Sequence, residues 1–188
     1  MDSLKELFKI GNGPSSSHTI GPERAAKKFK ERTPNTEKYV VELYGSLALT
    51  GKGHLTDWII TETLKPAETK IVWMPEVVYD YHTNGMKFKA LDNDGNVTEE
   101  WVVFSVGGGT IMELDQERRG PSKIYPYSKM DDIKKWCEEG KKEYWEYVVE
   151  HEGEEIFIFL KEIWDAMATA VERGIEKTGV LPGTLKLS

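Results

Sequence analysis

A chain of 188 residues, 39% hydrophobic and 30% charged, is long enough to bury a core and is typical of a globular protein. The formal net charge is −7 and no cluster of Lys and Arg stands out, which argues against nucleic acid as a partner. No apolar run approaches the roughly 20 residues that span a bilayer, and no signal-peptide pattern is present. We therefore expect no membrane association and a cytoplasmic location.

The first third of the chain predicts three helices and one strand. Residues 3–10 form a short amphipathic pattern that ends at the Gly-Asn-Gly-Pro sequence of residues 11–14. A second helix is predicted to begin near Ile20 to Pro22 and to end at residues 33–35, because proline is tolerated in a first helical turn. A strand at 38–49 with a turn at its glycine, and a helix at 54–64, follow.

The middle of the chain changes to strand patterns. Residues 77–81, 86–92, 98–106 and 110–114 are rich in β-branched and aromatic side chains. The sequence Asn-Asp-Gly-Asn at 93–96 is a hairpin signal, so antiparallel pairing is the simplest arrangement. These patterns predict an α+β fold with an antiparallel sheet of about four strands and helices packed on it.

The last third is helical and acidic. Residues 131–152 and 154–177 predict two helices, broken near Gly153. We place a domain boundary where strands give way to helices, which gives domains at 1–128 and 129–188. In the last helix Ile156, Phe159 and Ile163 follow helical spacing. We expect this helical extension to lack part of its packing surface because a neighbouring domain is absent, which favours self-association as a homodimer through these residues.

The sequence GPSSSHTIGP, residues 13–22, places five polar side chains before a predicted helix. Free N–H groups and the helix dipole at such a terminus favour a carboxylate or phosphate. Capping of the helix by Ser17 or Thr19 would need only one of the hydroxyls. An anion or substrate site and simple capping both remain open here.

His54 is a second candidate, because it follows two glycines and precedes a predicted helix. A histidine can act as a general base near neutral pH. A capping or buried core histidine is the alternative. A hydrolase using Ser17, His54 and Asp57 is disfavoured, because the sequence has no GxSxG elbow.

The remaining polar positions have simpler explanations. His82 precedes an Asn-Gly turn, the three glycines at 107–109 favour a bend or bulge, and His151 reads as a surface residue. The four histidines are far apart in sequence, and Cys137 is the single cysteine. We therefore predict no disulfide and no metal site built from this chain alone.

Taken together, four segments resemble the β domain of iron–sulfur-dependent L-serine dehydratases. They read SLKELFKIGNGPSSSHTIGP at 3–22, GSLALTGKGHLTD at 45–57, HTNGMKF at 82–88 and SVGGG at 105–109. The tail ERGIEKTGVLPGTLKLS, residues 172–188, resembles the junction at which the catalytic α domain of the single-chain enzymes begins. The fold is then expected to be similar to the allosteric substrate-binding domain of phosphoglycerate dehydrogenase.

The resemblance implies a cytoplasmic lyase that converts L-serine to pyruvate and ammonia, with a role in amino-acid degradation and gluconeogenesis. It implies a [4Fe–4S] cluster held by cysteines of the α domain, which would be the partner of this chain. By the same resemblance His54 would be the general base and His18 would bind or polarise the substrate. The carboxylate of the substrate would be held by Ser15, Ser16, Ser17 and Thr19.

The single cysteine departs from what a complete enzyme needs. A cluster needs at least three thiolates, so Cys137 reads as a packing residue and the chain as a cut segment or a separate subunit that is inactive alone. The alternative is a binding or regulatory module that recognises serine or another small anion. A binding module needs the serine-rich segment but has no obvious use for a base at His54.

Overall fold

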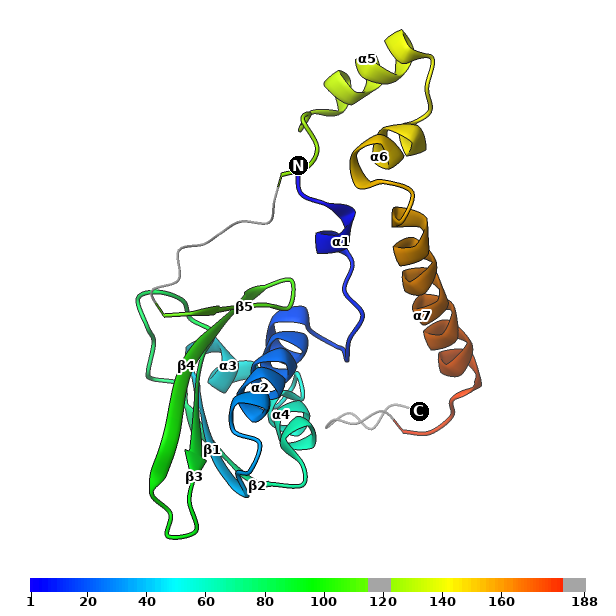
Figure 1. Ribbon diagram of the computed structural model, residues 1–188. Coiled ribbons are helices and arrows are strands. Elements are labelled where there is room, and N and C mark those ends of the chain that lie inside the picture. Colours follow the sequence, from blue (N-terminus) through cyan, green and yellow to red (C-terminus); the bar gives the residue numbers. More distant parts are fainter. Residues whose placement is uncertain (115–122, 181–188) are drawn as a thin grey trace. The chain divides into compact units, whose positions relative to one another are not determined.

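The computed structural model describes residues 1–114 and 123–180, so the tail segment 181–188 lies outside the described residues. They divide into two compact units (Figure 1). Residues 11–114 form the first, which we call the sheet unit. Residues 1–10 and 123–180 form the second, the helical unit. The domains at 1–128 and 129–188 were inferred only from the order of strands and helices along the chain, and they stay a prediction.

The sheet unit contains a five-stranded sheet in the order β2-β1-β3-β4-β5. The strands β1 and β2 are parallel, and the other neighbouring pairs are antiparallel. The predicted α+β fold is confirmed, with five strands in place of about four. Their bounds are β1 Lys38–Tyr44, β2 Glu68–Met74, β3 Gly85–Leu91, β4 Val97–Gly107 and β5 Thr110–Glu113.

Three strand assignments from the sequence need correction. Residues 45–49, predicted as the end of the first strand, belong to helix α3 Gly45–Thr50. The edge strand β2 was not predicted; it pairs in parallel with β1 because two helices cross over between them. Residues 77–81, predicted as a strand, form no strand in the structure. The rings of Tyr79 and Tyr81 in this segment pack instead against Phe104 of β4. The hairpin at 93–96 joins β3 and β4 as expected.

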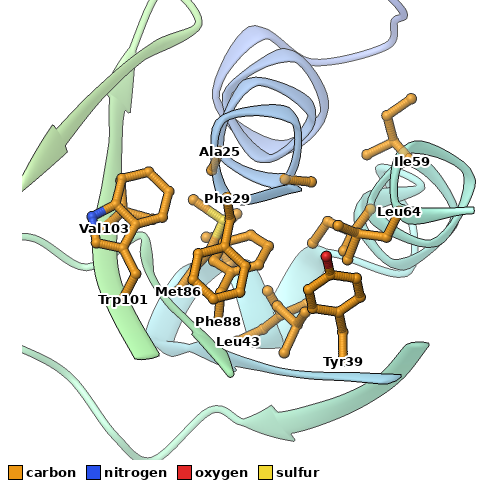
Figure 2. Close-up of a cluster of buried hydrophobic side chains, with 14 of the residues drawn as sticks. Ala25, Phe29, Tyr39, Leu43, Ile59, Leu64, Met86, Phe88, Trp101 and Val103 are labelled. Carbon is orange, nitrogen blue, oxygen red and sulfur yellow. The ribbon is translucent and has the colours of Figure 1, made fainter. Parts of the chain in front are cut away.

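Helices α2 and α4 cover one face of the sheet (Figures 1 and 2). Figure 2 shows Phe29 of α2 extending towards Phe88 of β3, with the ring centroids 5.5 Å apart. The helical segments of this unit are η1 Ser16–Ile20, α2 Gly21–Arg32, α3 Gly45–Thr50 and α4 Thr56–Leu64. The buried core residues are Ala25, Ala26, Phe29, Tyr39, Val41, Leu43, Leu47, Ile59, Ile60, Leu64, Met86, Phe88, Ala90, Trp101 and Val103.

The helical unit has four helices, α1 Leu4–Leu7, α5 Met130–Gly140, α6 Tyr144–Glu152 and α7 Ile156–Glu176. The single helix predicted at 131–152 is wrong, because the chain reverses at Lys141, which adopts a left-handed conformation with φ of 50°. Glu143 and Glu146 then form a capping box that starts α6. Cys137 is buried between α5 and α6 with Tyr125, Ile133 and Tyr147.

Glu152 fastens the N-terminal segment to this unit. Its carboxylate accepts hydrogen bonds from the Ser3 hydroxyl at 2.7 Å, the Leu4 backbone N–H at 2.7 Å and the Tyr125 hydroxyl at 2.8 Å. Burial alone would raise the pKa of Glu152, but these hydrogen bonds outweigh it and lower the pKa.

Some apolar side chains of helix α7 are buried and others are exposed. Ile156 and Ile163 are buried and Phe159 is half-buried, so two of the three residues predicted to self-associate already pack within the chain. Homodimer formation stays a prediction. The large apolar side chains of α7 that remain exposed are Phe157, Ile158, Trp164, Met167, Val171 and Ile175. Among the described residues, none of the helices is both long and apolar enough to cross a membrane.

Candidate functional site at the histidine pair

The four segments singled out in the sequence meet at one end of the sheet unit. The backbone N–H of Ser46 donates to the Thr83 carbonyl at 3.1 Å, and that of Ser105 donates to the Asn84 carbonyl at 3.0 Å. Gly21 lies so close to Ser105 that an added Cβ would stand 2.1 Å from its Oγ. Segments far apart in sequence therefore share one site.

The serine-rich segment is helical and not a loop. Residues 16–20 form the π-helical turn η1, in which the Ile20 N–H reaches the Ser15 carbonyl at 3.2 Å, and α2 continues from it. The cap is Ser15, whose Oγ accepts the His18 N–H at 3.2 Å, and not Ser17 or Thr19 as considered from the sequence. The helix thus begins earlier than predicted.

This turn brings His18 next to His54. Their ring centroids lie 4.8 Å apart with the planes inclined at 44°. His18 Nδ1 lies 2.9 Å from Ser17 Oγ, and its Nε2 lies 3.3 Å from Ser46 Oγ. Burial, and secondly the charge of a protonated His54, lower the pKa of His18, while a hydrogen bond to the Ser46 backbone acts in the opposite sense. His18 is therefore neutral at neutral pH.

The hydrogen bond of His54 fixes its tautomer. His54 Nδ1 lies 3.0 Å from the Thr50 carbonyl oxygen, which can only accept, so Nδ1 carries the proton. In the neutral ring Nε2 then has a free lone pair, and no hydrogen bond joins Nε2 to any of the described residues. Asp57 does not contact His54 by a hydrogen bond; it accepts the Trp58 N–H, so the triad with Ser17 is not formed.

Two buried threonines lock the backbones of the pair together. The Thr19 hydroxyl donates to the His54 carbonyl at 2.9 Å, and the Thr56 hydroxyl donates to the His18 carbonyl at 2.5 Å. In an α-helix the His18 carbonyl would accept the N–H of residue 22, but Pro22 has none. Pro22, which the sequence places in the first turn of a helix, therefore leaves the His18 carbonyl free to accept the hydroxyl of Thr56 from the segment that contains His54.

The predicted carboxylate-binding residues occupy different positions in this turn. Ser16 is exposed, and Ser15 and Ser17 are half-buried, with their Oγ atoms 3.4 Å apart. Thr19 is fully buried, and its hydroxyl is engaged with His54. The structure thus gathers all six candidate residues, with Thr19 on the inside of the turn.

Sequence reasoning missed Ser46, Thr50 and Thr56 as parts of this site. Ser46 and Thr50 lie one helical turn apart on α3, and each holds one of the two histidines. All three residues stand in the segment 45–57 that carried the resemblance. The Ser46 and Thr56 hydroxyls find their partners only through tertiary contacts with His18 of η1, whereas the Thr50 carbonyl meets His54 four residues along the chain.

The glycines at 107–109 make a bend, as the sequence indicated. All three have positive φ, between 59° and 104°. Arg24 of α2 donates to the Gly109 carbonyl at 2.9 Å and ties the bend to the helix that follows η1. The buried polar atoms Asn84 Oδ1 and Ser105 Oγ nearby have no hydrogen-bond partner among the described residues.

The comparisons with known proteins match all four of these segments to one family. The profile described as serine dehydratase beta chain matches residues 3–67 and 61–116. The chain belongs to the serine dehydratase beta chain family. It is 32% identical to L-serine dehydratase 2 of Escherichia coli (strain K12), over 100% of this chain and 52% of that protein.

Further relatives of the family give the same picture. An L-serine dehydratase of Haemophilus influenzae is 30% identical over 100% of this chain and 52% of its own length. One of Streptomyces coelicolor is 32% identical over 98% of this chain and 52% of its own length. The chain thus spans about half the length of the curated relatives it matches.

The iron–sulfur cluster expected from the resemblance does not fit the residues of this chain. Cys137 is the single cysteine, and it is buried in the helical unit. Within residues 1–114 and 123–180 no three His, Cys, Asp or Glu side chains stand together in a way that could hold a metal ion. A cluster would need cysteines from outside this sequence.

Proposed function

We propose that this family member supplies the proton-accepting and carboxylate-binding groups of an L-serine dehydratase, which converts L-serine to pyruvate and ammonia. The observation that carries the proposal is the pairing of His18, from the serine-rich turn, with His54, from the segment between α3 and α4, at a centroid distance of 4.8 Å. The whole reaction removes the α-proton and the β-hydroxyl as water, and hydrolysis of the resulting enamine yields pyruvate and ammonia.

In this proposal His54 accepts the α-proton at Nε2. Its Nδ1–H is held by the Thr50 carbonyl, which leaves Nε2 as the basic atom and stabilises the imidazolium that forms. The Thr19 hydroxyl fixes the His54 backbone, so the base would meet the substrate in a preset position.

His18 then binds or polarises the substrate. Both of its ring nitrogens face hydroxyl groups, and its lowered pKa keeps it neutral, so it accepts a proton less readily than an ordinary histidine. The exposed Ser16 and the half-buried Ser15 and Ser17 offer hydroxyls to the carboxylate. The fully buried Thr19 would contribute through the position of the turn.

Cysteines of a catalytic α domain outside this sequence would hold the [4Fe–4S] cluster. We expect the present chain alone to be inactive, because the elimination also needs help for the departing hydroxyl group. A cytoplasmic location and a role in serine degradation belong to the same proposal.

The second candidate is a module that binds serine or another small anion without catalysis. The neutral His18 and the hydroxyls of η1 are compatible with it. The orientation of His54 favours the enzyme, because a binding module has no need for a basic nitrogen that is held free of hydrogen bonds from the described residues.

The test is an anaerobic assay of pyruvate formation from L-serine. The chain is assayed alone and then mixed with a separately prepared, cluster-loaded catalytic half of a family member. The variants are His54→Asn and, as a control on the same segment, Asp57→Asn, because Asp57 only accepts the Trp58 N–H.

We expect activity only in the mixture, a loss of roughly 10²–10⁴-fold with His54→Asn, and little change with Asp57→Asn. Activity that survives His54→Asn would move the base elsewhere. An inactive mixture of two folded halves that still binds L-serine would support the binding module instead.

A further inference from the structure

Ser46 joins three of the four segments at the site. Its backbone N–H donates to the Thr83 carbonyl at 3.1 Å, its Oγ lies 3.3 Å from His18 Nε2, and its carbonyl accepts the Thr50 hydroxyl at 3.0 Å. The next turn of α3 ends at Thr50, whose carbonyl holds His54. One short helix therefore contacts both rings of the pair.

The His18 ring has one partner on each nitrogen, and the two partners lie on different elements. Ser17 is its neighbour in the same helical turn, whereas Ser46 stands on a different element that is anchored to the segment before β3. A neutral imidazole has one donor and one acceptor nitrogen. A hydroxyl group can pair with either the donor or the acceptor nitrogen, so the position of Ser46 on α3 decides the orientation of the His18 ring.

We propose that Ser46 is a positioning residue of this site, which holds the His18 imidazole in one neutral tautomer facing the ring of His54. Ser46 takes the proton at His18 Nε2, and the Ser17 hydroxyl donates to Nδ1. The 2.9 Å distance between Ser17 Oγ and Nδ1 is a hydrogen-bond length with either atom as the donor, so it accommodates this tautomer. A hydrogen bond to the Ser46 backbone also acts to raise the pKa of His18, in the sense expected of a carbonyl that accepts from a ring N–H.

This arrangement deepens the proposed function and rests on it for its catalytic meaning. With Nδ1 engaged by Ser17, a ring rotated about its Cβ–Cγ bond would no longer present Nε2 to α3. The substrate would then meet His18 in varying orientations. Ser46 thus acts on the reaction through His18, without itself contacting the reacting atoms.

The test measures the ring nitrogens of His18 directly by NMR on the full chain labelled with ¹⁵N-histidine. The four histidines are assigned with single His→Gln variants. The variants are Ser46→Ala, Thr50→Ala as the matched control, and Ser46→Thr as the rescue. Thr50→Ala removes a hydroxyl from the same helix but keeps the backbone carbonyl that holds His54.

We expect one tautomer of His18, protonated at Nε2, in the wild type, in Thr50→Ala and in Ser46→Thr. In Ser46→Ala the ¹⁵N chemical shifts of the two His18 ring nitrogens should converge as the tautomers mix, while the signals of His54 stay unchanged. Circular dichroism confirms that each variant is folded. In the reconstituted assay Ser46→Ala should lower kcat by up to about 10²-fold, with KM changed less.

Two results would overturn the proposal. One is an unchanged His18 spectrum in Ser46→Ala; the other is the same change in Thr50→Ala, which would show a general disturbance of α3. The NMR measurement needs neither L-serine nor a cluster. If the wild-type mixture makes no pyruvate, the proposed function fails, but the NMR measurement still shows whether Ser46 positions His18.

Discussion

The sheet unit and the helical unit bury apolar side chains to very different extents. The sheet unit has a core of 15 buried residues, whereas the core cluster of the helical unit has four. Helix α7 adds large apolar side chains that remain more than half exposed, such as Trp164 at 67% and Ile175 at 80%. The unit that carries the histidine pair therefore has the larger core of its own, and the helical unit depends more on polar anchors such as Glu152.

The largest expected effect on the free energy of unfolding comes from a substitution in the core of the sheet unit. Phe29 is fully buried and its ring lies within 5.9 Å of the rings of Tyr39 and Phe88. Phe29→Ala should lower the free energy of unfolding by about 3–5 kcal/mol, because it removes buried apolar surface and leaves a cavity. Urea unfolding followed by circular dichroism measures this. A loss below about 1 kcal/mol would mean that this core is not what stabilises the unit.

The next effect is on the helical unit. Glu152→Ala leaves the Leu4 N–H and two hydroxyls without their acceptor, which should cost about 1–3 kcal/mol. Amide hydrogen exchange should show the loss of protection in the helical unit and not in β1 or β3. The matched control is Glu150→Ala, whose exposed pair with Lys142 is expected to contribute less than about 1 kcal/mol. Equal effects from the two variants would contradict the role of Glu152 as an anchor.

A smaller effect concerns pH and the sheet unit. Burial and the neighbouring His54 lower the pKa of His18, so below the ordinary pKa near 6.5 the unfolded chain takes up a proton that the folded chain does not. Stability should therefore fall as pH falls from about 7 through the folded pKa of His18. Melting temperatures of the wild type and His18→Gln between pH 7 and 5 measure this. The variant should show a shallower decline, and parallel curves would exclude His18 as the cause.

The smallest expected effect is at the exposed face of α7. Trp164→Gln should change the free energy of unfolding by no more than about 0.5 kcal/mol, because the side chain is 67% exposed. Thermal unfolding of the dilute chain is the measurement. A loss of several-fold more would show that this face is covered in solution, and concentration-dependent melting would point to the predicted homodimer.

Local patterns predicted most of the sheet unit. The strands β1 and β3 alternate buried positions with more exposed ones, β4 and β5 are rich in β-branched and aromatic residues, and the turn at 93–96 has its own sequence signal. The strand β2 was missed because its partner is a parallel strand across a helical crossover, which no neighbouring turn announces. The segment 77–81 has strand-like composition, but its tyrosines pack against Phe104.

The candidate site was predictable in its residues and not in its geometry. The polar segments around His18 and His54 stood out in the sequence, and the structure brings the two rings together. The contacts of Ser46 and Thr56 depend on tertiary packing, so no local pattern indicated them. The π-helical form of residues 16–20 was also beyond reach, since the pattern there indicated a loop.

The turn η1 also has a consequence for the length of the protein between Ser15 and Pro22. A π-helical turn accommodates one residue more than the α-helix that follows it. Each residue turns the chain by about 100°, so deletion of a single residue here would swing His18 away from α3 even with every side chain retained. A change of length here alters the position of every side chain of the turn at once, so we expect insertions and deletions to disrupt the site. Comparison of natural sequences should therefore show this stretch free of gaps.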